Sequence, residues 1–271
     1  MLKLNAYQLK LIAIIGMISS HIVITWWDMI PTWLAFPMYA AGGLTFPILG
    51  YFIAQGYKYT SSLKKYILRV LLFGVIALPF HILAITIPMS GFPLSVSYPF
   101  LNIMFNIVIG LLVLRMYDKM KSKILFWLIF VVIIAPLSLA LLEWYFIGIA
   151  MVLMAHNLKN ETAQRIVPPL FAATLFFGIG IFTNAMATQD LANQIVEMGL
   201  TLPRLLDPAF SPVQLSFSIG MIIAAFLLKG YNGERGKKSK WLFYIIYPAH
   251  FIVLVVVGLM LGLIDLSLLG F

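Results

Sequence analysis

The sequence has no cysteine and few charged side chains, which make up 10% of its 271 residues. The lack of thiols excludes disulfides, thiol nucleophiles and cysteine-ligated metals. A soluble domain carries about a quarter of its residues as charged groups, so this chain has too little polar surface to enclose a core in water. Its 62% of hydrophobic residues indicate a protein of the lipid bilayer. We expect one integral membrane domain over residues 1–271.

Apolar runs separated by charged or Pro/Gly-rich breaks predict about nine transmembrane helices, because a helix needs about 20 apolar residues to cross the hydrocarbon core. The predicted fold is an all-α, polytopic membrane helix bundle. The fifth and sixth runs share one apolar stretch, residues 124–155, in which Pro136 and Glu143 mark the breaks. The expected ranges are 7–27, 33–57, 66–87, 98–116, 124–141, 143–156, 167–183, 212–228 and 241–263.

The net charge of +9 follows the positive-inside rule. With the N-terminus in the cytoplasm and the C-terminus outside, every Lys and Arg except Arg204 falls in a cytoplasmic loop or at the cytoplasmic end of a helix. Topology therefore accounts for the charge, and nucleic acid is not an expected partner. The outer segment 184–211 is predicted to hold a surface helix from Asp190 to Met198. It is either a loop that rests on the membrane or a lid over an external entrance.

Two histidines are predicted at the same depth inside the membrane. His21 follows Lys10 by eleven residues, which is about 16 Å along a helix. His250 follows Lys240 by ten residues, or about 15 Å from the same side. An ionisable group at this depth is a candidate functional residue. The alternative is that each histidine makes an interhelical hydrogen bond and nothing more.

The other polar residues of the predicted helices give weaker signals. Pro248 cannot donate to the carbonyl of Tyr244, so the last helix is expected to bend there. Asn102 and Asn106 are expected to join helices by hydrogen bonds. Glu143 is expected to be solvated at the outer surface. His81 and His156 lie nearer the ends of their predicted spans, and no sequence motif for a metal, nucleotide or nucleophile is present.

Three segments of the chain are similar to a known family: Leu2 to His21, Phe46 to Tyr57 followed by Lys65 to Phe73, and Tyr231-Asn232-Gly233-Glu234-Arg235-Gly236 leading to Phe243-Tyr244-Ile-Ile-Tyr247-Pro248-Ala-His250. They resemble the TraX family of integral membrane proteins, whose namesake is implicated in acetylating pilin subunits. The most specific segment is the ending, in which a Tyr-Asn-Gly motif precedes a Tyr-Pro-x-His motif. The family is similar to a larger superfamily of membrane acyltransferases, in which a basic residue, ten intervening residues and a catalytic His occupy the first helix.

The resemblance implies an acyltransferase, most simply an acetyltransferase, in the cytoplasmic membrane of a bacterium. Acetyl-coenzyme A or a longer acyl-coenzyme A would be the cosubstrate, with no metal. The acceptor would be an amine or hydroxyl of a pilin or other peptide N-terminus, a lipid or a cell-wall sugar. His21 would be the general base, and His250, Tyr247 or Ser20 would donate to the oxyanion. The expected cosubstrate-binding residues are Lys10, Arg69, Arg115, Asn232, Lys237 and Lys238.

One departure from the family pattern concerns the residue before the first-helix histidine. TraX-like chains often carry Asp there, whereas this chain has Ser20. A local carboxylate that would orient the imidazole is therefore missing, and Asp28 is about 10 Å further along the helix.

Two other functions remain open from the sequence. The first is a transporter or flippase in which paired histidines relay protons at the membrane midplane. The second is a scaffold or immunity factor in which the polar groups serve packing.

Overall fold

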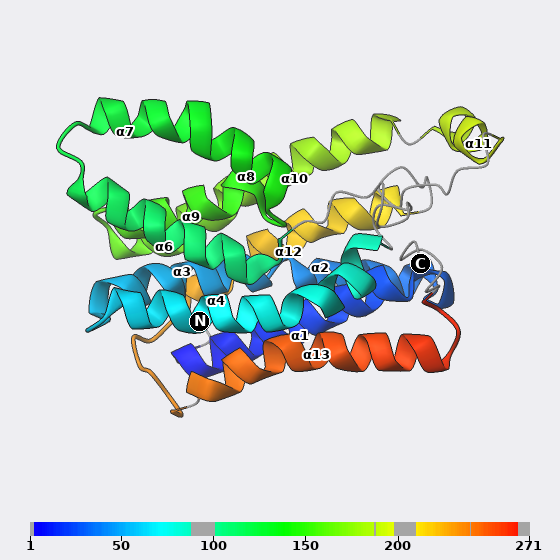
Figure 1. Ribbon diagram of the computed structural model, residues 1–271, viewed down its shortest axis with the longest axis horizontal. Helices are drawn as coiled ribbons and strands as arrows, with labels where there is room; N and C mark the ends of the chain where they lie inside the picture. Colours follow the sequence, from blue (N-terminus) through cyan, green and yellow to red (C-terminus); the bar gives the residue numbers. More distant parts are fainter. Residues whose placement is uncertain (1–2, 88–100, 187, 198–209, 239, 265–271) are drawn as a thin grey trace.

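The computed structural model describes residues 3–87, 101–186, 188–197, 210–238 and 240–264. These residues form helices and no β-strand, which confirms the predicted all-α class. Figure 1 shows a bundle in which α13 lies along one edge, near α1 and α4, and α7 and α8 lie along the opposite edge. The elements are α1 (Ala6–Thr25), η1 (Trp27–Met29), α2 (Thr32–Gly42), α3 (Thr45–Tyr59), α4 (Leu63–His81), η2 (Ile82–Thr86), α6 (Ile103–Lys119), α7 (Lys123–Ile129), η3 (Phe130–Ile134), α8 (Ala135–Leu141), α9 (Tyr145–Asn157), α10 (Glu161–Met186), α11 (Gln189–Glu197), α12 (Ser211–Lys229) and α13 (Lys240–Met260).

The described part of the chain has seven helices that are long and apolar enough to cross a membrane. Each of the nine predicted ranges falls on one helix or on consecutive helices, although residues 98–100 lie outside the described part. The two ranges without a full-length counterpart fall on α6, with 17 residues, and α9, with 13. The seven are Ala6–Thr25, Thr32–Tyr59, Leu63–Thr86, Lys123–Leu141, Glu161–Met186, Pro212–Lys229 and Trp241–Met260.

The sequence predicts two breaks between the fifth and sixth runs. The break at Pro136 is wrong, and the break at Glu143 is confirmed. Pro136 lies in the first turn of α8, directly after the π-helical turn η3. The wider π turn accommodates the proline, which has no N–H to donate, without ending the helix. The helix ends instead at Leu141, and α9 begins at Tyr145.

The predicted surface helix Asp190–Met198 corresponds to α11, which covers Gln189–Glu197. Met198 and residues 199–209 lie outside the described part of the chain, so the lid over residues 184–211 stays a prediction.

Glycines bring the backbones of α1, α2 and α12 into close contact. A Cβ atom at Gly16 would lie 2.1 Å from the carbonyl oxygen of Ala41, and one at Gly220 would lie 1.8 Å from that of Ala40. Small residues allow such approaches between membrane helices, where packing replaces the hydrophobic effect as the source of stability. These contacts fix the height of α1, and therefore of His21, relative to α2 and α12.

The segment 230–236, here called the strap, crosses the start of α1 and is hydrogen-bonded to it. The glycines at 233 and 236 have positive φ angles of 84° and 68°, and a Cβ atom at Gly236 would lie 2.6 Å from Oδ1 of Asn5. The strap therefore brings Arg235 and Lys237 to the end of the bundle where α1 begins. Its backbone hydrogen bonds run from Leu4 N to Gly230 O (3.0 Å), from Asn232 N to Leu4 O (2.9 Å) and from Ala6 N to Glu234 O (2.9 Å).

Candidate active site

His21 of α1 and His250 of α13 meet in the interior of the bundle. Nδ1 of His21 lies 2.8 Å from Nε2 of His250, and the two rings are stacked at an angle of 14°. Both residues are buried, with 6% and 7% of their surfaces exposed. The two histidines that the sequence places at one depth are thus in direct contact.

The backbone of α13 selects the tautomers of this pair. Nδ1 of His250 lies 3.1 Å from the carbonyl oxygen of Ile246, and a carbonyl can only accept a hydrogen bond. In a neutral His250 the hydrogen is therefore on Nδ1, and Nε2 accepts the N–H of His21 Nδ1. This arrangement leaves Nε2 of a neutral His21 with a free lone pair, as a general base requires.

Glu143 is the carboxylate that the first helix lacks. Its Oε1 lies 3.9 Å from Nε2 of His21, and its Oε2 lies 3.4 Å from Nε2 of His81. The prediction of a solvated Glu143 at the outer surface is wrong, because the side chain is 21% exposed and faces two buried imidazoles. His81, expected near the end of its span, is fully buried beside the same carboxylate.

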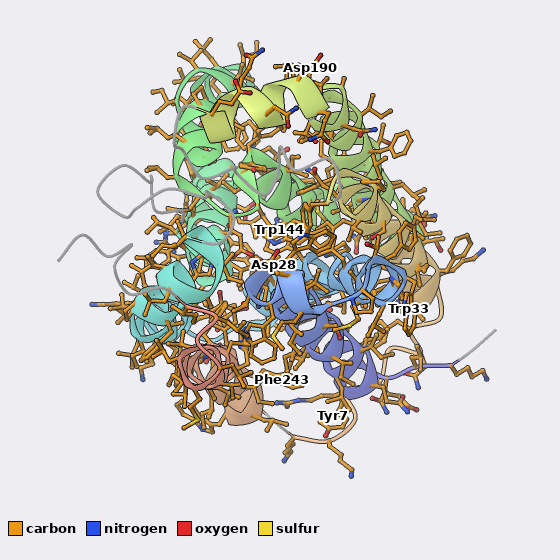
Figure 2. All side chains as sticks on the ribbon, turned by 90° about the vertical axis from the view of Figure 1, so that its right-hand side faces the viewer. Tyr7, Asp28, Trp33, Trp144, Asp190 and Phe243 are labelled. Atoms are coloured by element: carbon orange, nitrogen blue, oxygen red, sulfur yellow. The ribbon has the colours of Figure 1, made fainter. Side chains whose placement is uncertain are left out.

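The short length of α9 explains the position of Glu143. A helix of 13 residues spans about 20 Å, whereas the hydrocarbon core is about 30 Å thick. The start of α9 therefore lies within the bundle when its other end is at the membrane surface. Figure 2 shows Trp144, the residue before α9, at the centre of the bundle.

Hydrogen bonds from α6 hold the segment 142–145 in place. Asn106 donates to the carbonyl of Tyr145 (3.2 Å) and accepts from the N–H of Trp144 (3.1 Å). The N–H of Ile103, at the start of α6, donates to Oε2 of Glu143 (2.9 Å). Such N–H groups lack partners within the helix and favour a negative charge nearby. Tyr145 has a φ of 49°, a strained value for a residue other than glycine.

The predicted role of the two asparagines as interhelical links is confirmed. Asn102 donates to the carbonyl of Gly74 in α4 at 2.9 Å, and Asn106 ties α6 to the start of α9. Both are completely buried. Their links position the carboxylate as well as the helices.

A small cavity lies between His21 and Glu143. Its volume is about 20 Å³, enough for about one water molecule. Ser20, Trp144 and Phe217 also line it. The 3.9 Å between Nε2 of His21 and Glu143 is too long for a hydrogen bond, so a small polar group can reach both from this cavity.

Tyr247 and Ser20, the other predicted catalytic residues, both lie near the pair. The hydroxyl of Tyr247 is buried against the backbone of Ile103, and has no hydrogen-bond partner among the described residues. The hydroxyl of Ser20 donates to the carbonyl of Met17 at 3.0 Å. Tyr247 is therefore the better placed of the two to donate to a bound group.

A larger cavity of about 220 Å³ opens near the start of α1. Lys10, Arg235 and Lys237 line it, together with the aromatic rings of Phe52 and Phe243. The ammonium group of Lys10 lies 4.8 Å from the centre of the Phe52 ring and 5.8 Å from that of Phe243. None of the residues that line this cavity is acidic, so it suits an anionic ligand.

The structure places half of the predicted cosubstrate residues at this cavity. Lys10 and Lys237 line it, and Arg69 lies next to Tyr66 and Tyr244, which also line it.

The other three predicted cosubstrate residues do not line the cavity, and their role stays a prediction. Arg115 is exposed and lies near Tyr57, where the C-terminal ends of α6 and α3 meet. Lys238 is exposed beyond the strap. Asn232 uses its amide within the strap, where it accepts from the N–H of Glu234 and donates to its carboxylate, each at 2.9 Å.

Sequence reasoning missed three residues of these sites: Glu143, His81 and Arg235. The shortness of the apolar run after Glu143 was the available signal that this residue starts below the outer surface. Nothing local in the sequence distinguishes Arg235 from its basic neighbours. Among the described residues, no group of three or more His or acidic side chains is arranged to hold a metal ion.

Comparison with known proteins gives one family and one curated relative. The chain is 26% identical over 259 residues to "Probable fimbrial assembly protein FimC, serogroup H1" of Dichelobacter nodosus, a match that covers 92% of this chain and 94% of the relative. No solved structure matches the chain. The family described as "TraX protein" matches residues 5–258. The chain therefore belongs to the TraX family.

Proposed function

We propose that this protein is a membrane-embedded acyltransferase that moves an acyl group, most simply acetyl, from cytosolic acyl-coenzyme A to an amine or hydroxyl at the outer side of the membrane. The observation that carries the proposal is the hydrogen bond between His21 and His250, which leaves Nε2 of His21 facing Glu143 and a small cavity. Membership of the TraX family, and through it the likeness to membrane acyltransferases, supports the same function.

The proposed topology has nine membrane crossings, with the N-terminus in the cytoplasm and the C-terminus outside. In addition to the seven long helices, the proposal counts α6 and α9 as two shorter crossings. This topology puts the cavity around Lys10 at the cytoplasmic face of the bacterial inner membrane. Arg204 is then the one basic residue outside.

The basic cavity is proposed to bind the phosphates of the acyl donor. Lys10, Arg235 and Lys237 supply the cations, with Arg69 beside them. The aromatic walls at Phe52 and Phe243 can pack against the nucleobase. The donor's thin thioester arm would extend from this cavity toward His21.

The proposed reaction is direct transfer. The acceptor nitrogen or oxygen attacks the thioester carbonyl carbon while Nε2 of His21 takes its proton. The tetrahedral intermediate then collapses, the carbon–sulfur bond breaks, and the coenzyme A thiolate receives the proton from His21. Tyr247 donates a hydrogen bond to the oxyanion in between, a contribution of about 3 kcal/mol. Glu143 holds the imidazolium that forms, and His250 fixes its orientation.

The acceptor is proposed to be a pilus subunit or another secreted peptide with a free amine. The support is the name of the relative, which assigns it to fimbrial assembly. Lipids and cell-wall sugars are the other acceptor classes with a suitable amine or hydroxyl.

A transporter with an intramembrane proton relay is the second candidate. The run of contacts from His81 through Glu143 and His21 to His250 favours it, since such chains can pass protons. In a transporter, the basic residues of the cavity would reflect only the positive-inside rule and would have no binding role.

The decisive experiment measures acyl transfer in membranes that contain the protein, labelled acetyl-coenzyme A and an amine-bearing peptide. His21→Gln should lower transfer about a thousandfold, the effect expected for loss of a general base. The matched control is His156→Gln, because His156 pairs with Asp118 at the opposite end of α9 from the site. Transfer that survives His21→Gln unchanged would overturn the proposal.

A further inference from the structure

The small cavity and the basic cavity follow each other along the same helices. On α6, Ile103 lines the small cavity, whereas Met104 and Ile107 line the basic one. On α3, Thr45 lines the small cavity and Leu49 the basic one, a separation of about 6 Å along the axis. Both helices therefore show the same order of the two cavities, with no more than about one helical turn between the residues that line them.

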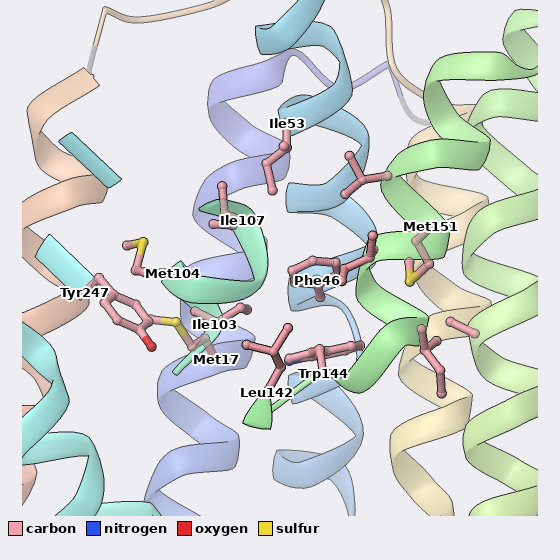
Figure 3. Close-up of a cluster of buried hydrophobic side chains, with 14 of the residues drawn as sticks. Met17, Phe46, Ile53, Ile103, Met104, Ile107, Leu142, Trp144, Met151 and Tyr247 are labelled. Atoms are coloured by element: carbon pink, nitrogen blue, oxygen red, sulfur yellow. The ribbon is translucent and has the colours of Figure 1, made fainter. Parts of the chain in front are cut away.

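Two methionines lie at this gap, one at each cavity. Met17 of α1 lines the small cavity one turn before His21, and Met104 of α6 lines the end of the basic cavity. Both belong to one cluster of buried side chains and are 4% and 7% exposed. Figure 3 draws them with Ile103 and Tyr247 as part of this cluster.

Methionine suits a barrier that must open. Its side chain is unbranched, has three rotatable bonds and refills irregular spaces at low cost. Ile103 is branched at Cβ and stiffer, and its N–H holds Glu143. The two methionines can therefore move aside while the carboxylate stays in place.

We propose that Met17 and Met104 form a selective constriction between the basic cavity and His21. The constriction admits a slender, flexible chain that ends in a thioester and keeps bulk water from the base. Exclusion of water matters because a base that activates an amine would also activate water, and the thioester would be hydrolysed. The inference rests on the proposed acyl transfer for the purpose of the constriction, whereas the position of the two methionines at the two cavities does not depend on it.

Removal of the methionine side chains tests the exclusion of water. Met17→Ala and Met104→Ala should raise the ratio of acetyl-coenzyme A hydrolysis to peptide acetylation about tenfold. The matched control is Met151→Ala, because Met151 is buried in the same cluster, 1% exposed, and lines neither cavity. An unchanged ratio in both Met17→Ala and Met104→Ala would overturn the exclusion of water.

Thiol labelling tests the constriction without any catalytic activity. The chain has no cysteine, so Met17→Cys and Met104→Cys each introduce a single thiol. An anionic methanethiosulfonate should label position 104 from the basic cavity, and coenzyme A should protect it. The thiol at position 17 should be labelled much more slowly than the thiol at position 104. Its labelling should become faster in the double variant that also carries Met104→Ala.

The labelling outcomes separate the inference from the proposed function. Equal labelling rates at positions 17 and 104 would show that no constriction exists. Failure of Met104→Ala to speed labelling at position 17 would show that no passage runs between them. If the labelling pattern is as expected but the protein transfers no acyl group, the constriction is supported and the proposed acyltransferase activity is contradicted.

Discussion

The carboxylate of Glu143 faces the imidazole of His21 across 3.9 Å, from a segment that is 122 residues away in the sequence. The missing carboxylate before His21 is thus supplied by the turn between α8 and α9. The same carboxylate also faces His81 at 3.4 Å. One carboxylate therefore lies within reach of two imidazoles and can stabilise a positive charge that forms on one of them.

Glu143→Gln should lower acetyl transfer about a hundredfold, because the amide cannot stabilise the imidazolium that forms on His21. The amide oxygen can still accept from the N–H of Ile103, so the thermal unfolding midpoint should change little. Glu161→Gln is the control, since Glu161 pairs with Arg165 and its side chain is 78% exposed. Initial rates and unfolding curves check both variants, and full activity in Glu143→Gln would contradict this role.

Arg235→Gln should raise the KM for acetyl-coenzyme A about tenfold, because one charge-assisted contact to a phosphate is lost. The kcat should stay close to that of the wild type, since the basic cavity is separate from His21. Arg115→Gln, also a basic residue of the proposed cytoplasmic side, should leave both constants unchanged, because Arg115 does not line the cavity. Equal effects of the two variants would point to general electrostatic attraction instead of a defined site.

Asn106→Ala should lower the free energy of unfolding by about 2 kcal/mol, since two hydrogen bonds of a fully buried amide are lost. It should also lower acetyl transfer, because the segment that carries Glu143 loses its link to α6. Asn193→Ala in the exposed face of α11 is the control. Reduced stability with unchanged transfer would show that Asn106 has no positioning role.

The depth of the two histidines could be predicted from the sequence because the rise of a helix is constant. The positive-inside rule assigns Lys10 and Lys240 to the same membrane surface, so counting residues placed His21 and His250 at one level, and the structure brings them into contact. The same counting failed for Glu143. Its position depends on Leu101 and Asn106, whose hydrogen bonds fold the segment 142–145 inward.

The lateral positions of the basic residues could not be predicted either. The positive-inside rule assigns a side of the membrane but gives no direction within its plane. Arg115 and Arg235 look equivalent by that rule. The strap across the start of α1 brings Arg235 to the cavity. That strap depends on backbone hydrogen bonds between residues 4–6 and residues 230–234, which are far apart in the sequence.

Gly220→Ala should strongly destabilise the protein, because the added Cβ atom would lie 1.8 Å from the carbonyl oxygen of Ala40 and would push α12 from α2. A cost of more than about 3 kcal/mol is expected for such overpacking. Gly178→Ala in α10 is the control. It meets no atom within 4 Å and should stabilise by up to about 1 kcal/mol through helix propensity. Thermal unfolding in detergent compares them, and similar midpoints would contradict the close packing.

His250→Ala should lower the kcat for acetyl transfer about a hundredfold and leave the KM for acetyl-coenzyme A unchanged. Without the acceptor at Nε2 of His250, the N–H of His21 Nδ1 has no fixed partner, and the imidazole can present either nitrogen to the cavity. His250→Gln restores an acceptor through its amide oxygen and should recover part of the rate. A merely structural role for His250 would make both variants equally slow, or would raise KM together with the loss of kcat. Steady-state kinetics of the three proteins therefore separate control of the tautomer from simple packing.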